Sequence, residues 1–165
     1  PCGQLDQIMI LFAREGMGTH FDPKTRKIDY VPLGEGAADF RIVGLDTGTV
    51  RPGLEKSTYK VRRQECEELV KLAQDAGFEI TCLGDVRDQQ LYESIAGKFQ
   101  STRPELVERL SYIYKAQKRF YEMMDAWRSG DIEKVGGISL SDLESMNRTL
   151  HRLERFWTDQ IRYRL

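Results

Sequence analysis

The sequence contains few of the residues that build metal sites and disulfide frameworks. Its three cysteines, Cys2, Cys66 and Cys82, are odd in number and show no Cys-x-x-Cys spacing. We therefore expect free thiols in a reducing, cytoplasmic compartment. The two histidines, His20 and His151, lie far apart in the chain. We accordingly predict no zinc or iron site and no metal bound by the protein itself.

A strong net charge and long apolar runs are missing as well. The 25 basic and 26 acidic residues leave a formal net charge of −1, which gives no overall attraction to nucleic acid or to an anionic membrane. No apolar run reaches the length of a membrane span, and no signal peptide is recognised. The arginines that gather after residue 147 have few aromatic residues between them, so we interpret them as a solvated face. We predict neither a nucleic acid nor a membrane as partner.

The length and the amino-acid composition of the chain are typical of a folded protein. With 165 residues, 40% hydrophobic and 31% charged, the chain is long enough for one domain covering residues 1–165. Apolar residues at helical spacing predict helices over residues 4–14, 57–76, 85–96, 104–128, 132–135 and 141–157. Shorter runs predict about three strands near the N-terminus, over residues 19–21, 27–33 and 40–46, and a brief extended run over 78–83. The pattern indicates an α+β fold.

Several local signals set the predicted boundaries. The stretch Asp22-Pro23-Lys24-Thr25 has the chemistry of a turn between two strands. Pro104 suits the start of the long helix, where a missing N–H costs nothing. We interpret the apolar stripe of that helix as core rather than as a cofactor box; it comprises Leu106, Leu110, Ile113, Phe120, Met124 and Trp127.

The first candidate site is the stretch Pro1-Cys2-Gly3-Gln4-Leu5-Asp6-Gln7. Gly3 lets a ligand approach the backbone directly before a helix, whose first N–H groups form a positive end. Asp6 on the first turn can stay ionised and accept a proton from a substrate hydroxyl. On spacing alone, the alternative that Asp6 is only a favourable first-turn acid is the stronger one.

Two further stretches contain plausible ligand groups. Residues 48–57 resemble a phosphate loop, but Leu54 and Glu55 separate the second glycine from Lys56, so we reject that interpretation. Residues 57–67 place Tyr59, Arg62 and Arg63 at a helix start. Tyr59 could contact a polyol, and the arginines could bind anions or pair with the glutamates at 65 and 67. A solvated, salt-bridged helical face is the more economical interpretation.

Taken in order, these blocks resemble the galactokinases of the GHMP small-molecule kinase superfamily. The resemblance covers residues 1–137, with 138–165 as a divergent C-terminal helix. It is carried by Pro1-Cys2-Gly3-x-x-Asp6-Gln7, the strand ending at Asp46, Arg51-x-x-Leu54, Ser57-x-Tyr59-x-x-Arg62-Arg63-x-Glu65-Cys66-Glu67, and Ala126-Trp127-Arg128-Ser129-Gly130-Asp131 followed by Val135-Gly136.

The resemblance implies roles for four residues. Asp6 would abstract or orient the anomeric hydroxyl proton of galactose or a related sugar, and Gly3 would place its backbone beside that sugar. Tyr59 would contact a sugar hydroxyl, and Arg51 would offset charge near the phosphoryl-transfer centre. ATP and Mg²⁺ are the implied cofactors. The positions of Arg62, Arg63 and Cys66 we interpret as structural.

The sequence also departs from the family. It lacks the N-terminal sugar motif, the Pro-x-x-x-Gly-Leu-Ser-Ser-Ser phosphate loop and the glycine-rich C-terminal motif, and Pro52-Gly53 replaces His-Ser. We therefore expect a partial, central piece of the family's chain that is inactive when isolated, which its start at Pro1 also suits. Self-association or a partner chain would cover its exposed apolar faces. The alternatives are a non-catalytic sugar-binding or sensing relative and a structural helical interaction module over 104–165.

Overall fold

The computed structural model describes residues 4–42 and 58–142, with the side chains of residues 58 and 59 left out of the account. Within these ranges the chain forms a two-stranded antiparallel sheet and several helices, which confirms the α+β prediction. The chain divides into two compact units, residues 1–41 with 119–165 and residues 42–118. The prediction of a single domain stays a prediction.

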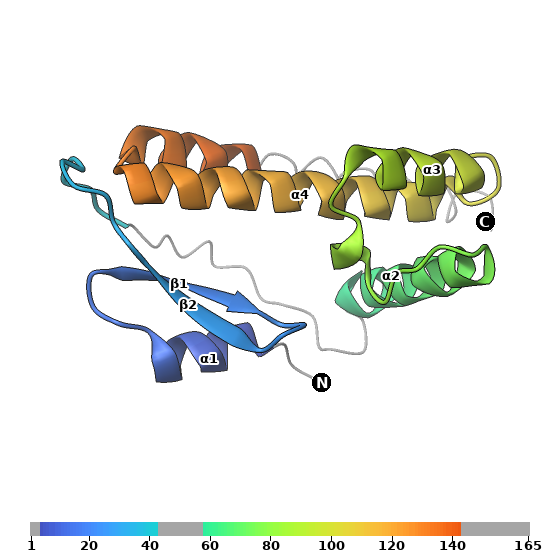
Figure 1. Cartoon of the computed structure of the whole chain (residues 1–165), viewed down its shortest axis with the longest axis horizontal. Helices are drawn as coiled ribbons and strands as arrows, with labels where there is room; N and C mark the ends of the chain where they lie inside the picture. Colours follow the sequence, from blue (N-terminus) through green and yellow to red (C-terminus); the bar gives the residue numbers. More distant parts are fainter. Residues whose placement is uncertain (1–3, 43–57, 143–165) are drawn as a thin grey trace, which may run out of the picture. The chain divides into compact units, whose positions relative to one another are not determined.

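The first unit contains helix α1 (Leu5–Phe12) and a hairpin of β1 (Met17–Asp22) and β2 (Lys27–Pro32) (Figure 1). The strands pair in register from Met17 opposite Pro32 to Asp22 opposite Lys27. The predicted turn forms as expected, because Asp22 Oδ1 accepts a hydrogen bond from the backbone N–H of Lys24 at 2.8 Å.

The chain leaving the hairpin packs against the C-terminal end of helix α4 (Pro104–Ser129). The Trp127 indole N–H donates to the carbonyl of Val31 at 2.9 Å, and the N–H of Gly34 donates to the carbonyl of Trp127 at 2.9 Å. Gly130 ends α4 with a φ of +75°, a conformation that favours glycine. The Trp127 side chain thus binds the hairpin, and the residues that follow the hairpin bind the end of α4 backbone to backbone.

The first unit also contains a helical segment over residues 132–142, drawn beside the end of α4 in Figure 1. Asp142 Oδ1 accepts hydrogen bonds from Arg119 Nε at 2.9 Å and Nη2 at 2.6 Å. The prediction of a short turn at 132–135 and a new helix from 141 was wrong in the described range. Glycine is a poor helix former, yet the segment continues through Gly136 and Gly137, because Ile138 is buried and Asp142 pairs with Arg119.

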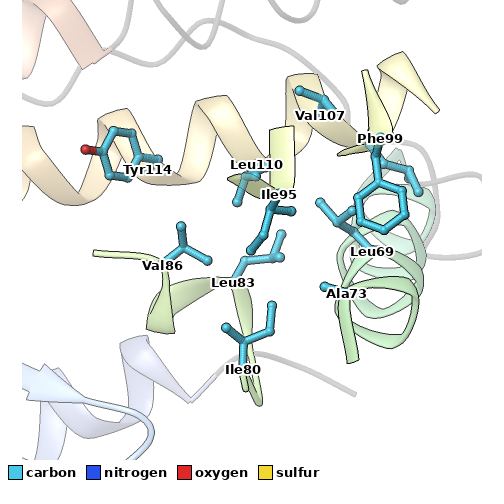
Figure 2. Close-up of a cluster of buried hydrophobic side chains, with 11 residues drawn as sticks. Leu69, Ala73, Ile80, Leu83, Val86, Ile95, Phe99, Val107, Leu110 and Tyr114 are labelled. Atoms are coloured by element: carbon cyan, nitrogen blue, oxygen red, sulfur yellow. The ribbon is translucent and has the colours of Figure 1, made fainter. Parts of the chain in front are cut away.

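The second unit is built from α2 (Thr58–Asp75), a 3₁₀ helix η2 (Leu83–Asp85), α3 (Gln89–Phe99) and the first part of α4. Its core cluster is drawn in Figure 2; the cluster comprises Leu69, Ala73, Ile80, Leu83, Val86, Ile95, Phe99, Leu106, Val107, Leu110 and Tyr114. The stripe prediction for α4 is confirmed at Leu106 and Leu110, which are fully buried, whereas Phe120 is 40% exposed.

Two predicted extended runs do not form strands where they are described. Residues 40–42 are not in a strand, and 43–46 lie outside the described residues, so the described part has two strands rather than three. Residues 78–80 are likewise irregular, and Leu83 begins η2. Here Asp85 Oδ2 accepts from the N–H groups of Thr81 and Cys82 at 2.8 and 3.2 Å. These local bonds compete with strand pairing.

Candidate functional site

The candidate catalytic residue Asp6 lies in the first turn of α1. Asp6 is exposed to solvent. Most of the helix is exposed as well, and none of its residues is buried. The C-terminal end of α1 is anchored to the hairpin, because Tyr30 Oη donates to the carbonyl of Phe12 at 2.8 Å. The Arg14 guanidinium lies 3.8 Å from the centre of the Tyr30 ring. The helix therefore has a fixed end and an accessible first turn.

The other three predicted site residues are not described as side chains. Gly3 and Arg51 lie outside the described residues, and Tyr59 is described only as part of the α2 backbone. Asp6 belongs to the first unit and Tyr59 to the second. Their roles, and their assembly into one site, stay predictions.

The first unit contains an apolar hollow of about 180 Å³ that the sequence analysis did not predict. It lies between the hairpin and α4 and is lined by Gly18, Thr19, His20, Val31, Phe120, Met123, Met124 and Trp127. Gly18 allows the close approach of Trp127, since a Cβ there would lie 3.3 Å from the indole nitrogen. Three of these residues, Phe120, Met124 and Trp127, belong to the apolar stripe of α4 that we interpreted as core.

The hollow has the chemistry of a binding surface rather than of a catalytic centre. His20 is the only lining residue with an ionisable side chain. Its ring lies 5.2 Å from the Phe120 ring, centre to centre, and its Nδ1 lies 3.8 Å from Asp29 Oδ2. No carboxylate or cysteine lines the hollow, and apart from Thr19 and His20 its walls offer apolar contact.

The second unit contains charged pairs between α2 and α4. Arg109 donates from Nε and Nη2 to Glu65 Oε2 at 2.9 and 2.7 Å, and Arg109 is 8% exposed. Arg103 pairs with both Glu68 and Glu105. The Arg103 hydrogen bonds lower the pKa of the Glu68 and Glu105 carboxyls below their usual values, and these two acids raise the pKa of Arg103. These pairs fix the two helices together.

The predicted salt-bridged face at the start of α2 forms only in part. Arg63 Nε donates to Glu67 Oε1 at 2.8 Å, as a pair four residues apart on an exposed face. Arg62 behaves differently: its Nε and Nη2 atoms are buried and have no hydrogen-bond partner. Cys66 is a free thiol on the same helix, and its burial raises its pKa. The two adjacent arginines are therefore not equivalent.

The described ranges contain neither a metal-binding cluster nor a membrane-spanning helix. No group of three histidine, cysteine, aspartate or glutamate residues within residues 4–42 and 58–142 is placed to hold a metal ion. Within the part of the chain that the structure describes, no helix is both long and apolar enough to cross a membrane.

The chain is similar in sequence to several curated galactokinases. It is 28% identical to the galactokinase of Thermotoga maritima over 160 residues, which cover 97% of this chain and 41% of that protein. The galactokinase of Pyrococcus furiosus is 31% identical over 139 residues, covering 84% of this chain and 34% of its own length. That of Chloroflexus aggregans is 29% identical over 145 residues, covering 88% and 35%.

The other comparisons gave nothing further. No protein-family model matches the chain. No solved structure gives a significant match. The chain thus spans 34–41% of the length of the curated relatives described above. These similarities identify it as a partial galactokinase-like chain.

Proposed function

We propose that this chain is the sugar-binding portion of a galactokinase-like kinase. The parent reaction is the ATP- and Mg²⁺-dependent phosphorylation of galactose, or a related sugar, at its anomeric hydroxyl. The observation that carries the proposal is the extent of the similarity. Proteins named galactokinase match 82–97% of the chain at 26–31% identity.

Asp6 is the proposed proton acceptor for the sugar hydroxyl. Its place on the first turn of α1 supports this role, because the positive end of a helix stabilises a carboxylate. Its exposure supports it too, since an acceptor must come within hydrogen-bond distance of the hydroxyl. We propose that Gly3, directly before this helix, lets the sugar approach the backbone.

Roles for Tyr59 and Arg51 are also part of the proposal. Tyr59 would offer its hydroxyl to a sugar hydroxyl from the first turn of α2. Arg51 would offset negative charge that develops during phosphoryl transfer. Both proposals rest on the motif positions in the sequence.

The residues present do not fit a complete ATP and Mg²⁺ site. Mg²⁺ in such enzymes is held by one or two carboxylates together with the substrate phosphates, which a phosphate loop brings into place. The sequence contains no such loop, and the described residues contain no metal-binding cluster. Phosphoryl transfer depends almost wholly on positioning and electrostatics. We therefore propose that the isolated chain binds sugar but does not turn it over.

The exposed apolar residues of α1 suggest that this helix is covered by further protein. Six of the eight residues of α1 are apolar, yet Ile10 and Leu11 are 83% and 73% exposed. A helix that is apolar all round is normally covered by protein. We propose that α1 belongs to a GHMP-kinase-like fold, in which further polypeptide, a partner chain or a second copy covers it.

Thermal unfolding with and without millimolar galactose tests the proposal. We expect the Tm of the wild-type chain to rise saturably, and the Asp6→Asn variant to lose most of the rise. Glu133→Gln, an exposed substitution outside the proposed site, is the matched control and should respond like wild type.

A coupled assay of ADP release in the presence of ATP and Mg²⁺ completes the test. We expect none from the isolated chain. Galactose-dependent ADP release that Asp6→Asn abolishes would contradict the proposed inactivity. A Tm that galactose leaves unchanged would contradict sugar binding and favour a structural interaction module.

A further inference from the structure

Helix α1, which contains Asp6, has little packing of its own. None of its eight residues is buried; Ile8 and Met9 are half-buried, and the others are exposed. Gln4, which precedes the helix, makes no side-chain hydrogen bond that caps it. A helix this short is marginal by itself and depends on tertiary contacts. The position of Asp6 is therefore set by the contacts that hold α1 to the hairpin.

One of these contacts is a hydrogen bond from the side chain of Tyr30. Its hydroxyl donates to the carbonyl oxygen of Phe12 at 2.8 Å. Phe12 is the last residue of α1, so its carbonyl is among the four that no N–H of the helix itself can satisfy. The guanidinium carbon of Arg14 lies 3.8 Å from the centre of the Tyr30 ring. The Tyr30 side chain thus contacts the end of α1 through its hydroxyl and the following residues through its ring.

This hydrogen bond is a second connection between α1 and the hairpin. Along the chain, α1 is joined to β1 by residues 13–16. Tyr30 instead lies on β2, where it pairs with Thr19 of β1. Its neighbour Val31 is 6% exposed, and the Val31 carbonyl accepts the indole N–H of Trp127 at 2.9 Å. Tyr30 therefore reaches α1 from a strand that α4 holds in place.

We propose that Tyr30 is a positioning residue of the sugar site, whose hydroxyl sets the direction of α1 and thereby the place of Asp6. Asp6 precedes Phe12 by six residues, which is about 9 Å along a helix. A change in the direction of the helix at Phe12 therefore displaces Asp6. A proton acceptor must lie about 2.6–3.2 Å from the hydroxyl that it binds, so a displacement of about 1 Å weakens the contact. The inference rests on the proposed function of Asp6.

The half-buried residues Ile8 and Met9 are the competing explanation for how α1 is held. They lie between Asp6 and Phe12, and their burial attaches the helix by apolar contact. Apolar contact is non-directional, whereas a hydrogen bond weakens steeply as its angle departs from linear. Tyr30 therefore fixes the direction of the helix, while the apolar contact fixes its attachment. If the apolar contact were sufficient, removing the Tyr30 hydroxyl would change neither α1 nor sugar binding.

Tyr30→Phe in the full chain isolates the hydrogen bond, because it removes the hydroxyl and keeps the ring that Arg14 contacts. Tyr121→Phe is the matched control, since it removes a hydroxyl from an exposed tyrosine of α4 in the same unit. The first measurement is amide hydrogen exchange by NMR without sugar. We expect the α1 amides of Tyr30→Phe to exchange about fivefold faster than in wild type, the change in equilibrium constant that one hydrogen bond supplies. The hairpin amides, and all amides of the control, should keep their wild-type rates.

The second measurement is calorimetric titration with galactose. We expect the Kd to rise about fivefold in Tyr30→Phe and to stay at the wild-type value in Tyr121→Phe. The sugar-free Tm of Tyr30→Phe should fall by no more than about 4 °C. A purely structural role would lower that Tm without changing the Kd. Wild-type exchange rates in α1 of Tyr30→Phe, or an unchanged Kd, would overturn the positioning role alone. A wild-type chain that binds no galactose would instead contradict the proposed function, and the positioning role with it.

Discussion

Replacing Gly34 by alanine probes the backbone contact between the hairpin and α4. A Cβ atom at Gly34 would lie 2.4 Å from the carbonyl oxygen of Arg128 and from the nitrogen of Gly130, and 2.5 Å from the carbonyl carbon of Ser129. All three are backbone atoms, so no side-chain rotation can relieve the clash. The chain at Gly34 must move away, and its hydrogen bond to the carbonyl of Trp127 is then lost or stretched.

The expected cost follows from these two effects. Forcing extra volume into a packed contact costs about 1 to 3 kcal/mol, and rigid backbone neighbours place this case at the upper end. Loss of the hydrogen bond adds about 1 kcal/mol. We expect Gly34→Ala to lower the free energy of unfolding by about 4 kcal/mol. For a chain of this length, the Tm should fall by about 8 to 16 °C.

A second glycine provides the control for the same chemical change. Gly137 lies in the helical segment 132–142, and a Cβ there meets no atom within 4 Å. Gly137→Ala should therefore stabilise the chain by about 0.5 to 1 kcal/mol through helix propensity. Urea and thermal unfolding followed by circular dichroism measure both variants. A Gly34→Ala variant within about 0.5 kcal/mol of wild type, or two variants with effects of the same sign, would refute the reasoning.

Two further predictions concern the ion pairs of the second unit. Arg109→Met should destabilise the chain by about 3 kcal/mol in urea unfolding, because it leaves the Glu65 carboxylate partly buried without its partner, whereas replacing both residues by leucine should be far milder. Arg103→Gln should weaken the dependence of the free energy of unfolding on pH in the acidic range. Arg103 lowers the pKa of Glu68, so the stability from this pair is present above the ordinary glutamate pKa and is lost as pH falls through the folded-state pKa. A titration from pH 7 to pH 3 that is identical in wild type and Arg103→Gln would contradict this.

The elements with strong local signals were predictable from the sequence. The long helix was expected over 104–128 and observed as Pro104–Ser129, and the second was expected over 57–76 and observed as Thr58–Asp75. Periodic apolar residues, an N-terminal proline and C-terminal glycines act within one element, so their effect is visible in one stretch of sequence. The hairpin was predictable for the same reason, through its turn.

Elements that depend on less obvious local bonds were misplaced. The helix expected over 85–96 is observed as Gln89–Phe99 because the Asp88 side chain accepts a hydrogen bond from the N–H of Leu91 at 2.8 Å and caps it. Four residues were thus assigned to a helix that begins only after Asp88. A strand expected over 40–46 depends on a neighbouring strand to pair with, and pairing partners cannot be identified from local sequence.

The candidate site was predictable only one residue at a time. Motif spacing singled out Asp6 and placed it on a helix start, where the structure has it. Motif spacing cannot say whether Asp6, Gly3, Arg51 and Tyr59 approach one another, since that depends on long-range packing. The apolar hollow beside Trp127 was missed because a Met-rich stripe on a helix has the same pattern whether it faces a core or lines a groove.

Arg62 and Arg63 show what the sequence pattern contained and what it did not. In the sequence they are two adjacent arginines with glutamates three and four residues away, and a salt-bridged face is the natural interpretation for both. Successive residues on a helix point about 100° apart, so Arg63 reaches Glu67 on the exposed side while Arg62 shares the face of Leu69 and Ala73. That periodicity could have distinguished the two arginines. The engagement of Glu65 by Arg109, 44 residues away, could not have been foreseen, and it is this contact that leaves the Arg62 guanidinium without a carboxylate one turn along its own helix.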